Sequence, residues 1–366
     1  ILKDLDSYKF HNPIDVEGGI ARAELALGYT LTEEQKNIVR MVNDHNIVIF
    51  TGSAGTGKSS SARAILESFK GSHIACCSLS AKAAQRIKEA TGFEASTIHR
   101  LLGYDGNNFI YNAANRLPAD IVFIDECSMM NCDIYYSIIS AVKEGAKVIM
   151  CGDNLQLPPI GAGNVFSDLL EKSNTFSVSK LTKVHRQAEK SGILNDANAI
   201  RKGIMPIRLT DTQITTGDLQ DMMYVFRDQR DRIRNIAVNQ FVKIARSAGI
   251  NNVVLAVPRK DTVINSALEL NRCIQSELID TSNTSYIEHN EHRFYIGDRV
   301  LQIENDGDRN VYNGEVGFVE NVFSNVPSTD TCMTVRVKDE VGDKYVNYTQ
   351  EDLKTSTLGY AMTVHK

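Results

Sequence analysis

The stretch Asn46-Ile-Val-Ile-Phe-Thr-Gly52-Ser-Ala-Gly-Thr-Gly57-Lys58-Ser59 decides the fold of this 366-residue chain. An apolar strand runs into a glycine-rich turn, and a helix is expected from Lys58 to about residue 69. The spacing G-x-x-x-x-G-K-[ST] in that context predicts a loop whose backbone N–H groups surround phosphate oxygens. The alternative is a chance glycine-rich turn, which would not require strand, turn and helix to be in register.

Each position of this loop has an expected role. Lys58 would reach the β- and γ-phosphates of a nucleotide, and the Ser59 hydroxyl would ligate Mg²⁺. The expected nucleotide contacts are Gly52, Ser53, Ala54, Gly55, Thr56, Gly57, Lys58, Ser59 and Ser60.

A second apolar run, Ile121–Ile124, ends in the adjacent carboxylates Asp125 and Glu126. We expect Asp125 to hold Mg²⁺, directly or through water, and Glu126 to polarise the attacking water. Successive strand residues point to opposite faces, so a single carboxylate at a strand end is often only a capping group. A pair that ends a buried strand, in a chain with a phosphate loop, favours the catalytic interpretation.

Two further segments offer groups suited to phosphoryl transfer. A strand over residues 148–152 leads into a turn carrying Gln156, whose amide can hydrogen-bond the γ-phosphate and the attacking water. The segment Val184-His-Arg186-Gln offers a cation for the charge that develops in the transition state. The simpler alternatives are a surface turn and an ordinary surface arginine.

The chain alternates strands and helices, which predicts an α/β fold with parallel sheets. Strands are expected at residues 46–50, 74–80, 121–124, 146–151 and 252–257, and helices at 32–42, 58–69, 81–91 and 261–278. The helix at residues 32–42 would begin with a capping box formed by Thr32 and Gln35. A small hairpin is expected near residues 103–117. From residue 294 the period changes to two, and residues 299–303, 314–322, 333–338 and 344–348 predict a small β-barrel.

Composition sets limits but does not choose a function. The net charge of −5 argues mildly against nucleic-acid binding, although a motor can line one channel with cations while the rest of its surface is acidic. No apolar run is long enough to span a bilayer and no signal peptide precedes the fold, so we expect a cytoplasmic protein without a membrane partner. The seven cysteines form no C-x-x-C pair and are expected to be reduced, buried thiols. Because the chain begins at Ile1 and stops at Lys366 within a patterned segment, we expect a fragment of a longer protein.

From Tyr29 onward, these segments in this order resemble the superfamily 1 helicases, most closely the RecD-like branch. The stretch from Tyr29 to Gln35 resembles the Q motif, whose glutamine contacts adenine. Other similar stretches are Ser78–Ala84 (motif Ia), Ser96–Tyr104 (a DNA-binding segment), Val184–Gln187 (motif IV, with an arginine finger), Leu358–Lys366 (the start of motif V), and Tyr295–Val300 with Asn313–Gly317 (the barrel insertion).

The resemblance implies two RecA-like P-loop domains with ATP in the cleft between them, a hairpin inserted in the first and an SH3-like β-barrel in the second. The expected boundaries are an N-terminal segment (1–28), the first domain (29–180), the second domain (181–293 and 353–366) and its barrel (294–352). The implied activity is Mg²⁺-assisted ATP hydrolysis that drives 5′→3′ movement on single-stranded DNA and duplex unwinding. We expect a monomeric motor whose partners are single-stranded DNA and junctions of single- and double-stranded DNA.

Hydroxyls and helix N-termini make good phosphate contacts. The expected DNA contacts, by this chemistry and by resemblance, are Ser80, Lys82, Thr97, His99, Asn313, Thr363 and His365. As a single residue, His99 is equally a satisfied core histidine. Tyr104, Phe109 and Tyr111 would either stack on a base or form the small core of the hairpin.

The chain departs from the family pattern in two places. Leu79-Ser80 stands where the family usually has Pro-Thr, and the sequence stops before motif VI, which supplies a second arginine. Two other functions therefore stay open: a DNA-stimulated ATPase that remodels protein–DNA complexes, and a catalytically weak nucleotide-binding regulatory subunit.

Overall fold

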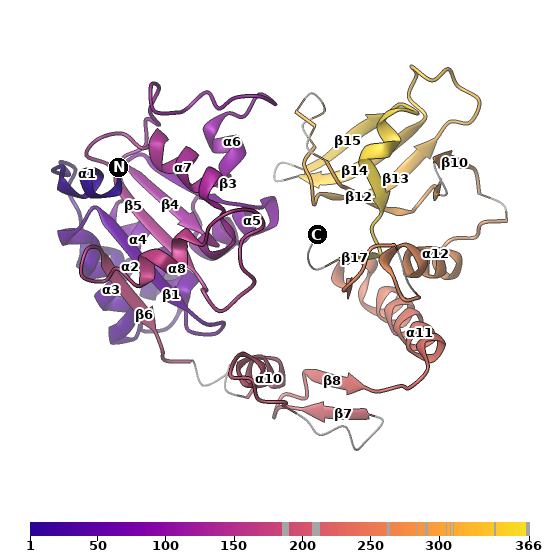
Figure 1. The fold of residues 1–366 in the computed structure, drawn as a ribbon, viewed down its shortest axis with the longest axis horizontal. Helices are drawn as coiled ribbons and strands as arrows, with labels where there is room; N and C mark the ends of the chain where they lie inside the picture. Colours follow the sequence, from indigo (N-terminus) through magenta and orange to yellow (C-terminus); the bar gives the residue numbers. More distant parts are fainter. Residues whose placement is uncertain are drawn as a thin grey trace. The chain divides into compact units, whose positions relative to one another are not determined.

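The computed structural model describes residues 1–184, 190–206, 213–261, 264–282, 284–289, 292–304, 306–307, 309, 311–339 and 342–363. The chain forms two compact units, residues 1–208 with 215–223, and residues 209–214 with 224–366 (Figure 1). No helix within the described ranges is long and apolar enough to cross a membrane.

The first unit is built on a six-stranded parallel sheet with the order β3-β2-β4-β5-β1-β6. Every residue of β1 and β5 is buried, as is typical of parallel strands covered on both faces. The strands are β1 (Ile47–Gly52), β2 (Ile74–Ser78), β3 (Ala95–Thr97), β4 (Ile121–Asp125), β5 (Lys147–Gly152) and β6 (Ser177–Leu181).

Two layers of helices enclose this sheet, each with its own hydrophobic core. One face is covered by α1 (Leu2–Ser7), α6 (Ile98–Leu102), α7 (Cys132–Ala141) and α8 (Val165–Leu170). The other is covered by α2 (Val16–Leu27), α3 (Glu33–Asp44), α4 (Lys58–Ser68) and α5 (Ala81–Thr91). The short helix η1 (Cys127–Met129) follows β4. The predicted α/β class with a parallel sheet is confirmed, and the capping box of Thr32 and Gln35 opens α3.

The insert at residues 103–117 contains one isolated antiparallel bridge, between Tyr104 and Phe109, instead of two regular strands. The Asp105 carboxylate accepts hydrogen bonds from the N–H groups of Asn107 and Asn108, and the Asn112 side chain holds a second turn in the same way. Such local bonds use backbone donors that a strand ladder would need, so the hairpin stays rudimentary.

The second unit places two helices beside a two-stranded parallel sheet formed by β9 and β17. Its α/β elements are α11 (Arg230–Ala248), η2 (Ile250–Asn252), β9 (Leu255–Val257), α12 (Ala267–Leu278) and β17 (Ala361–Thr363). The helix α12 begins later than the sequence predicts because Ser266 caps it and Asn265 has a positive φ of 70°. Helix α10 (Gly192–Arg201) and the strands β7 (Gln213–Thr216) and β8 (Met222–Val225) precede α11 along the chain.

The predicted β-barrel is an open sheet with the order β15-β14-β13-β12-β16 in the part of the chain that the structure describes. The strand β16 has only three residues before the chain leaves for β17, which leaves little edge to pair with β15. The elements are β10 (Tyr286–His289) and β11 (His292–Tyr295), a separate hairpin, then β12 (Arg299–Gln302), β13 (Val316–Val322), β14 (Met333–Asp339), β15 (Gly342–Tyr348), η3 (Asp352–Thr355) and β16 (Ser356–Leu358). One core joins this SH3-like sheet to α11 and α12.

A buried lysine, Lys147, stands at the start of β5, the strand that leads to the Gln156 turn. Its side chain is buried, and its Nζ donates to the carbonyl oxygen of His45 at 2.9 Å and to Oδ1 of Asn46 at 3.2 Å. The Nζ also lies 5.0 Å from the centre of the Phe10 ring. Burial lowers the pKa of Lys147 to about 8, because the charged ammonium loses solvation.

This pKa predicts a specific pH dependence of stability. Between pH 8 and the ordinary lysine pKa, the unfolded chain binds more protons than the folded one, so the free energy of unfolding should rise with pH across that window. The rise should be up to about 3 kcal/mol. Lys147→Met should remove it, whatever other groups titrate there, and urea unfolding of both proteins at several pH values measures the difference. Identical pH slopes would show that Lys147 is not responsible.

Candidate active site

The three segments expected to handle ATP leave neighbouring strands of the first sheet, in the order β4-β5-β1. The strand β1 ends at Gly52, β4 at Asp125 and β5 at Gly152. Because the strands are parallel, their carboxyl ends share one edge of the sheet, which is where open α/β sheets bind ligands. The phosphate loop, the carboxylate pair and the Gln156 turn therefore emerge side by side (Figure 1).

The loop after β1 is closed around its own lysine. The Lys58 Nζ donates to the carbonyl oxygen of Gly52 at 2.6 Å, and the Thr56 hydroxyl donates to the carbonyl oxygen of Ser53 at 2.8 Å. Gly57 has a φ of 84°, in the left-handed region that favours glycine, and it caps α4. The ammonium group thus lies within the loop, next to the backbone that would surround phosphates.

The remaining loop residues divide between surface and support. Ser59, Ala54 and Gly55 are exposed, whereas Ser60 is buried with its hydroxyl 2.7 Å from the Tyr29 hydroxyl. Only Ser59 of the two serines therefore presents its side chain at the surface, as a metal ligand requires.

Gln35 is fully buried behind the loop. Its Nε2 donates to the carbonyl oxygens of Thr56 and Gly57, at 3.4 and 3.3 Å, and its Oε1 accepts from the Thr32 N–H at 2.8 Å. The side-chain oxygen of Gln35 thus contacts the start of α3, and its side-chain nitrogen contacts the phosphate loop. The contact of Gln35 with adenine stays a prediction, while its support of the phosphate loop is a contact that the sequence did not reveal.

The carboxylate pair occupies a strained and desolvated position. Glu126 has a φ of 55°, unusual for a residue with a side chain, and its Oε2 is buried without a hydrogen-bond partner among the residues that the structure describes. Burial raises the pKa of both carboxyls, and the charge of Asp125 raises that of Glu126 further. Strain, an unpaired buried acceptor and a raised pKa together are typical of a group that meets its partner during a reaction.

The chemistry of these donors suits Mg²⁺. Mg²⁺ in nucleotide sites takes one or two carboxylates and completes its shell with phosphate oxygens and water. The exposed Ser59 hydroxyl and the Asp125 carboxylate at the end of β4 provide oxygen ligands of this kind. Within the described ranges, no group of three His, Cys, Asp or Glu side chains forms a self-sufficient metal site, so phosphates would have to supply the remaining ligands.

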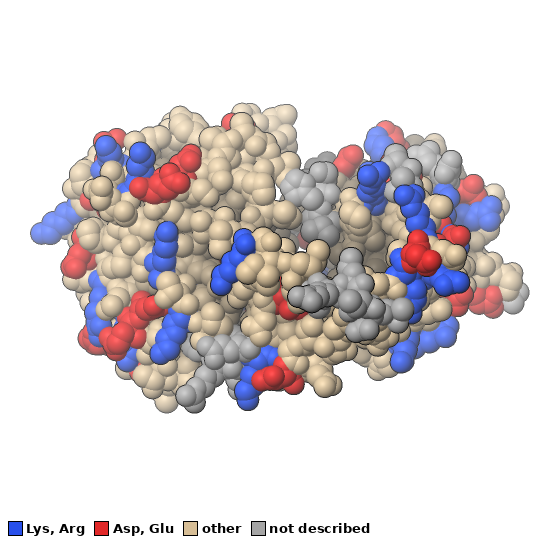
Figure 2. Space-filling model, turned by 60° about the horizontal axis from the view of Figure 1, so that its bottom comes forward, with Lys and Arg blue, Asp and Glu red and all other residues tan. Residues whose placement is uncertain are grey.

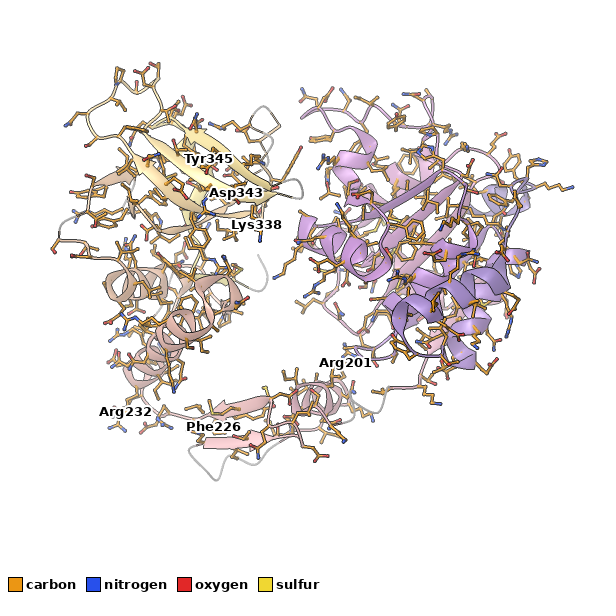
Figure 3. All side chains as sticks on the ribbon, turned by 180° about the vertical axis from the view of Figure 1, so that it is seen from behind. Arg201, Phe226, Arg232, Lys338, Asp343 and Tyr345 are labelled. Atoms are coloured by element: carbon orange, nitrogen blue, oxygen red, sulfur yellow. The ribbon has the colours of Figure 1, made fainter. Side chains whose placement is uncertain are left out.

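The turn that carries Gln156 is held by an ion pair between the buried Asp153 and the half-buried Arg201. Asp153 is 1% exposed, and its carboxylate lies 2.7 Å from Nη2 of Arg201, the last residue of α10 (Figure 3). The same carboxylate accepts from the Leu155 N–H at 3.2 Å and from Nε2 of Gln156 at 3.4 Å. Sequence reasoning missed Arg201, because nothing local marks a residue that acts 48 positions away from its partner.

Glu34 is a second residue that the sequence did not single out. Its carboxylate accepts from the Thr182 hydroxyl at 2.6 Å and from the N–H groups of Thr182 and Lys183. The hydrogen bond from the Thr182 hydroxyl is the main reason that the pKa of Glu34 is lowered. Helix α3 therefore fixes the chain shortly before Arg186, which itself lies outside the described residues, as does His365.

The expected DNA contacts of the first unit gather near the ends of β2 and β3. Ser78 of β2 is paired in register with Thr97 of β3, and each strand leads into a helix. Ser80 caps α5 and Thr97 caps α6, each accepting a backbone N–H, while Lys82 is exposed in the first turn of α5. Two helix N-termini with hydroxyls thus share one edge of the sheet, a surface suited to phosphates.

The aromatic residues of the insert pack around His99. The His99 ring lies 5.6 Å from that of Tyr104 and 5.8 Å from that of Phe109, and burial lowers its pKa. Phe109 and Tyr111 pack against the first core, but Tyr104 is 43% exposed. Phe109 and Tyr111 therefore pack in the core, which is one of the two expected arrangements, whereas the Tyr104 ring is accessible to a base.

The expected DNA contacts of the second unit lie on different elements. Asn313 is exposed in the turn before β13, and Thr363 is the half-buried last residue of β17. On the face shown in Figure 2, acidic and basic side chains are interspersed rather than gathered into one basic patch. On this face, DNA binding would depend on local contacts and not on a broad positive field.

Two family models match the chain: an AAA domain over residues 30–221, and the SH3 domain of ATP-dependent RecD-like DNA helicases over residues 270–338. The chain belongs to the RecD-like superfamily 1 helicases. The similarity covers the phosphate loop, the carboxylate pair and the Gln156 turn in the first model, and most of the open SH3-like sheet in the second.

Two curated relatives that match most of this chain agree with this family. The chain is 32% identical over 342 residues to the ATP-dependent RecD2 DNA helicase of Deinococcus radiodurans, covering 92% of this chain and 43% of that protein. It is 27% identical over 371 residues to the RecBCD enzyme subunit RecD of Mycolicibacterium smegmatis, covering 91% of this chain and 63% of that protein. The chain therefore spans about half the length of the curated relatives it matches.

A solved structure supports the fold. Bacteroides Pif1 bound to single-stranded DNA superposes with a TM-score of 0.51 at 19% identity, covering 92% of this chain and 83% of that one.

The Asp153–Arg201 pair predicts the effect of a substitution remote from the phosphate loop. Arg201→Ala would leave a buried carboxylate without its cation and loosen the turn of Gln156. We expect kcat for ATP hydrolysis to fall about tenfold with little change in KM, because Gln156 is expected to act in the transition state. Steady-state ATPase kinetics measure this, with the exposed neighbour substitution Lys202→Ala as the control. Equal loss in both variants, or none in Arg201→Ala, would contradict the role of the ion pair.

Proposed function

We propose that this chain is the motor of an ATP-dependent DNA helicase that moves 5′→3′ on single-stranded DNA and unwinds duplex. The observation that carries the proposal is the common sheet edge from which the phosphate loop, Asp125–Glu126 and the Gln156 turn emerge. The match to the SH3 domain of RecD-like DNA helicases and the relative named as a RecD2 DNA helicase support the choice of DNA as partner.

ATP hydrolysis follows from the groups at this edge. The loop N–H groups and Lys58 would bind the β- and γ-phosphates, with Ser59 and Asp125 holding Mg²⁺. Mg²⁺, when bound, supplies charge neutralisation at the phosphates. The unpaired Oε2 of Glu126 would accept a hydrogen bond from the attacking water and then its proton, a role helped by the raised pKa of this carboxyl.

Two further residues complete the proposed reaction. Gln156, held by Asp153, would orient the water and contact the γ-phosphate, so that its turn senses whether ATP is intact. Arg186 would supply positive charge to the transition state as an arginine finger.

The proposed DNA contacts follow from the helix N-termini of the first unit and from the family resemblance. Ser80, Lys82 and Thr97 would bind backbone phosphates, with His99 beside them. Asn313, Thr363 and His365 would contribute from the second domain. The proposed division keeps residues 29–180 as the first ATPase domain and residues 294–352 as an insert in the second, in a monomeric motor that binds single-stranded DNA and its junctions with duplex.

Substitutions at the loop and at the carboxylate pair should separate binding from chemistry. Glu126→Gln keeps the shape but removes the proton acceptor, so turnover should fall by roughly two or more orders of magnitude while ATP affinity stays near that of the wild type. Lys58→Ala should weaken ATP binding as well as abolish hydrolysis. Phosphate release and the binding of a fluorescent ATP analogue measure the two effects. Wild-type turnover in Glu126→Gln would assign the water to another residue.

The function itself is tested by strand displacement with the full-length protein on duplexes carrying a 5′ or a 3′ single-stranded tail. We expect ATP-dependent displacement from the 5′ tail only. ATP hydrolysis that DNA stimulates without any displacement would instead favour a remodelling ATPase. ATP binding without stimulated hydrolysis would favour a regulatory subunit.

A further inference from the structure

The SH3-like sheet and the strand that carries Thr363 are joined by only two residues. The strand β16 ends at Leu358 and β17 begins at Ala361, and both intervening residues, Gly359 and Tyr360, are buried. The Gly359 N–H donates to the carbonyl oxygen of Arg299 at 2.8 Å, and a Cβ at Gly359 would lie 3.2 Å from the backbone nitrogen of Leu301. The chain thus passes from one sheet to the other through a packed connection and not through a loose linker.

A buried carboxylate holds this connection. Asp298, which precedes β12 of the SH3-like sheet, is 0% exposed. Its Oδ1 accepts from the Tyr360 hydroxyl at 2.7 Å. Its Oδ2 accepts from the Tyr295 N–H at 2.7 Å and from Nε2 of Gln275 at 2.5 Å. Burial raises the pKa of Asp298 to about 6, and the three donors around its two oxygens oppose that rise.

Helix α12 holds both sides of the connection. Gln275 reaches Asp298, and Asn271, one turn earlier on the same face, brackets the first residue of β17. The Asn271 side chain donates to the carbonyl oxygen of Ala361 at 2.9 Å and accepts from its N–H at 2.7 Å. The insert and β17 are therefore fixed to one helix, which Figure 1 shows beside β17.

Directional bonds distinguish this connection from ordinary core packing. An apolar cluster would bury the same segments without the cost of a desolvated carboxylate, but apolar contacts fix relative positions less strictly than hydrogen bonds. The Tyr360 ring already packs edge-on against Phe241 of α11, 6.2 Å between centres. The Tyr360 hydroxyl adds two hydrogen bonds: it donates to Asp298, and it accepts from the Arg299 N–H at 3.3 Å.

We propose that Tyr360 and Asp298 form a joint that transmits the engagement of DNA by the SH3-like insert to β17 and Thr363. This role of the joint rests on the proposed function, because it requires that DNA stimulates ATP hydrolysis. Tyr360 is a positioning residue here: its side chain is fully buried, and it sets how β17 responds when DNA engages the insert. Breaking the joint should leave the basal reaction intact and uncouple it from DNA.

The substitution Tyr360→Phe tests the joint because it keeps the ring and removes only the hydroxyl. We expect basal ATPase activity within about twofold of the wild type, and a five- to tenfold loss of the stimulation by oligo(dT). Tyr348→Phe is the matched control, since Tyr348 is also buried, ends β15 of the SH3-like sheet, and donates its hydroxyl to Oε1 of Gln302 at 2.8 Å, away from the joint. Stimulation of Tyr360→Phe equal to that of the control would overturn the proposal.

A second measurement does not depend on DNA stimulation. Amide hydrogen exchange of residues 361–363 in the full-length protein should be faster in Tyr360→Phe than in the wild type or Tyr348→Phe. If the wild type shows no stimulation by DNA, the proposed function fails, and exchange alone then decides whether the joint holds β17. Unchanged exchange in Tyr360→Phe would overturn the joint whatever the function. Should Tyr360→Phe not fold, Gln275→Leu removes another bond to Asp298 and is measured in the same way.

Discussion

The parallel pairing of β4, β5 and β1 is the constraint on which the rest of the first unit depends. Parallel strands must return through crossovers, so each face of the sheet is covered by helices and the central strands β1 and β5 are fully buried. Polar chemistry is then confined to the loops that follow the strands. Because those loops share one edge, three segments that are far apart in sequence need no other device to meet.

In the first unit, buried carboxylates have two different roles, and the hydrogen-bond partners of each carboxylate indicate its role. Asp153 is paired with Arg201 and bonded to its own turn, which leaves it satisfied and suited to holding a backbone in place. Glu126 has an oxygen that no described residue bonds, on a strained backbone, an arrangement that lowers stability unless a ligand completes it. The contrast distinguishes a supporting group from the group that we propose to react.

Sequence alone predicted the features that depend on residues close together in the chain. The phosphate loop, the Asp125–Glu126 strand end and the capping box at Thr32 each lie within a few residues, so spacing and residue type were enough. Long-range contacts were out of reach: Arg201, at the end of α10, pairs with Asp153, and nothing near either residue in the sequence indicates this contact. No helix was expected at residues 230–248, where the long helix α11 forms. The open edge of the SH3-like sheet was also missed, because strand patterns give the number of strands but not the closure of a barrel.

The second unit shows how an inserted domain is made part of its host. An insert that is connected to its host only by its two chain ends would be free to tilt. A displacement of such an insert would move the linkers and not the host domain. Here the insert shares one hydrophobic core with α11 and α12. Both of its boundaries are also bonded to α12, through Gln275 near its beginning and Asn271 at the strand that follows it. A displacement of the sheet must therefore move α12 and β17 together, or break buried hydrogen bonds whose groups have no water to replace them. We therefore expect the hydrogen bonds between the insert and α12 to contribute more to the transmission of movement than to the stability of the fold. The shared apolar core already provides that stability.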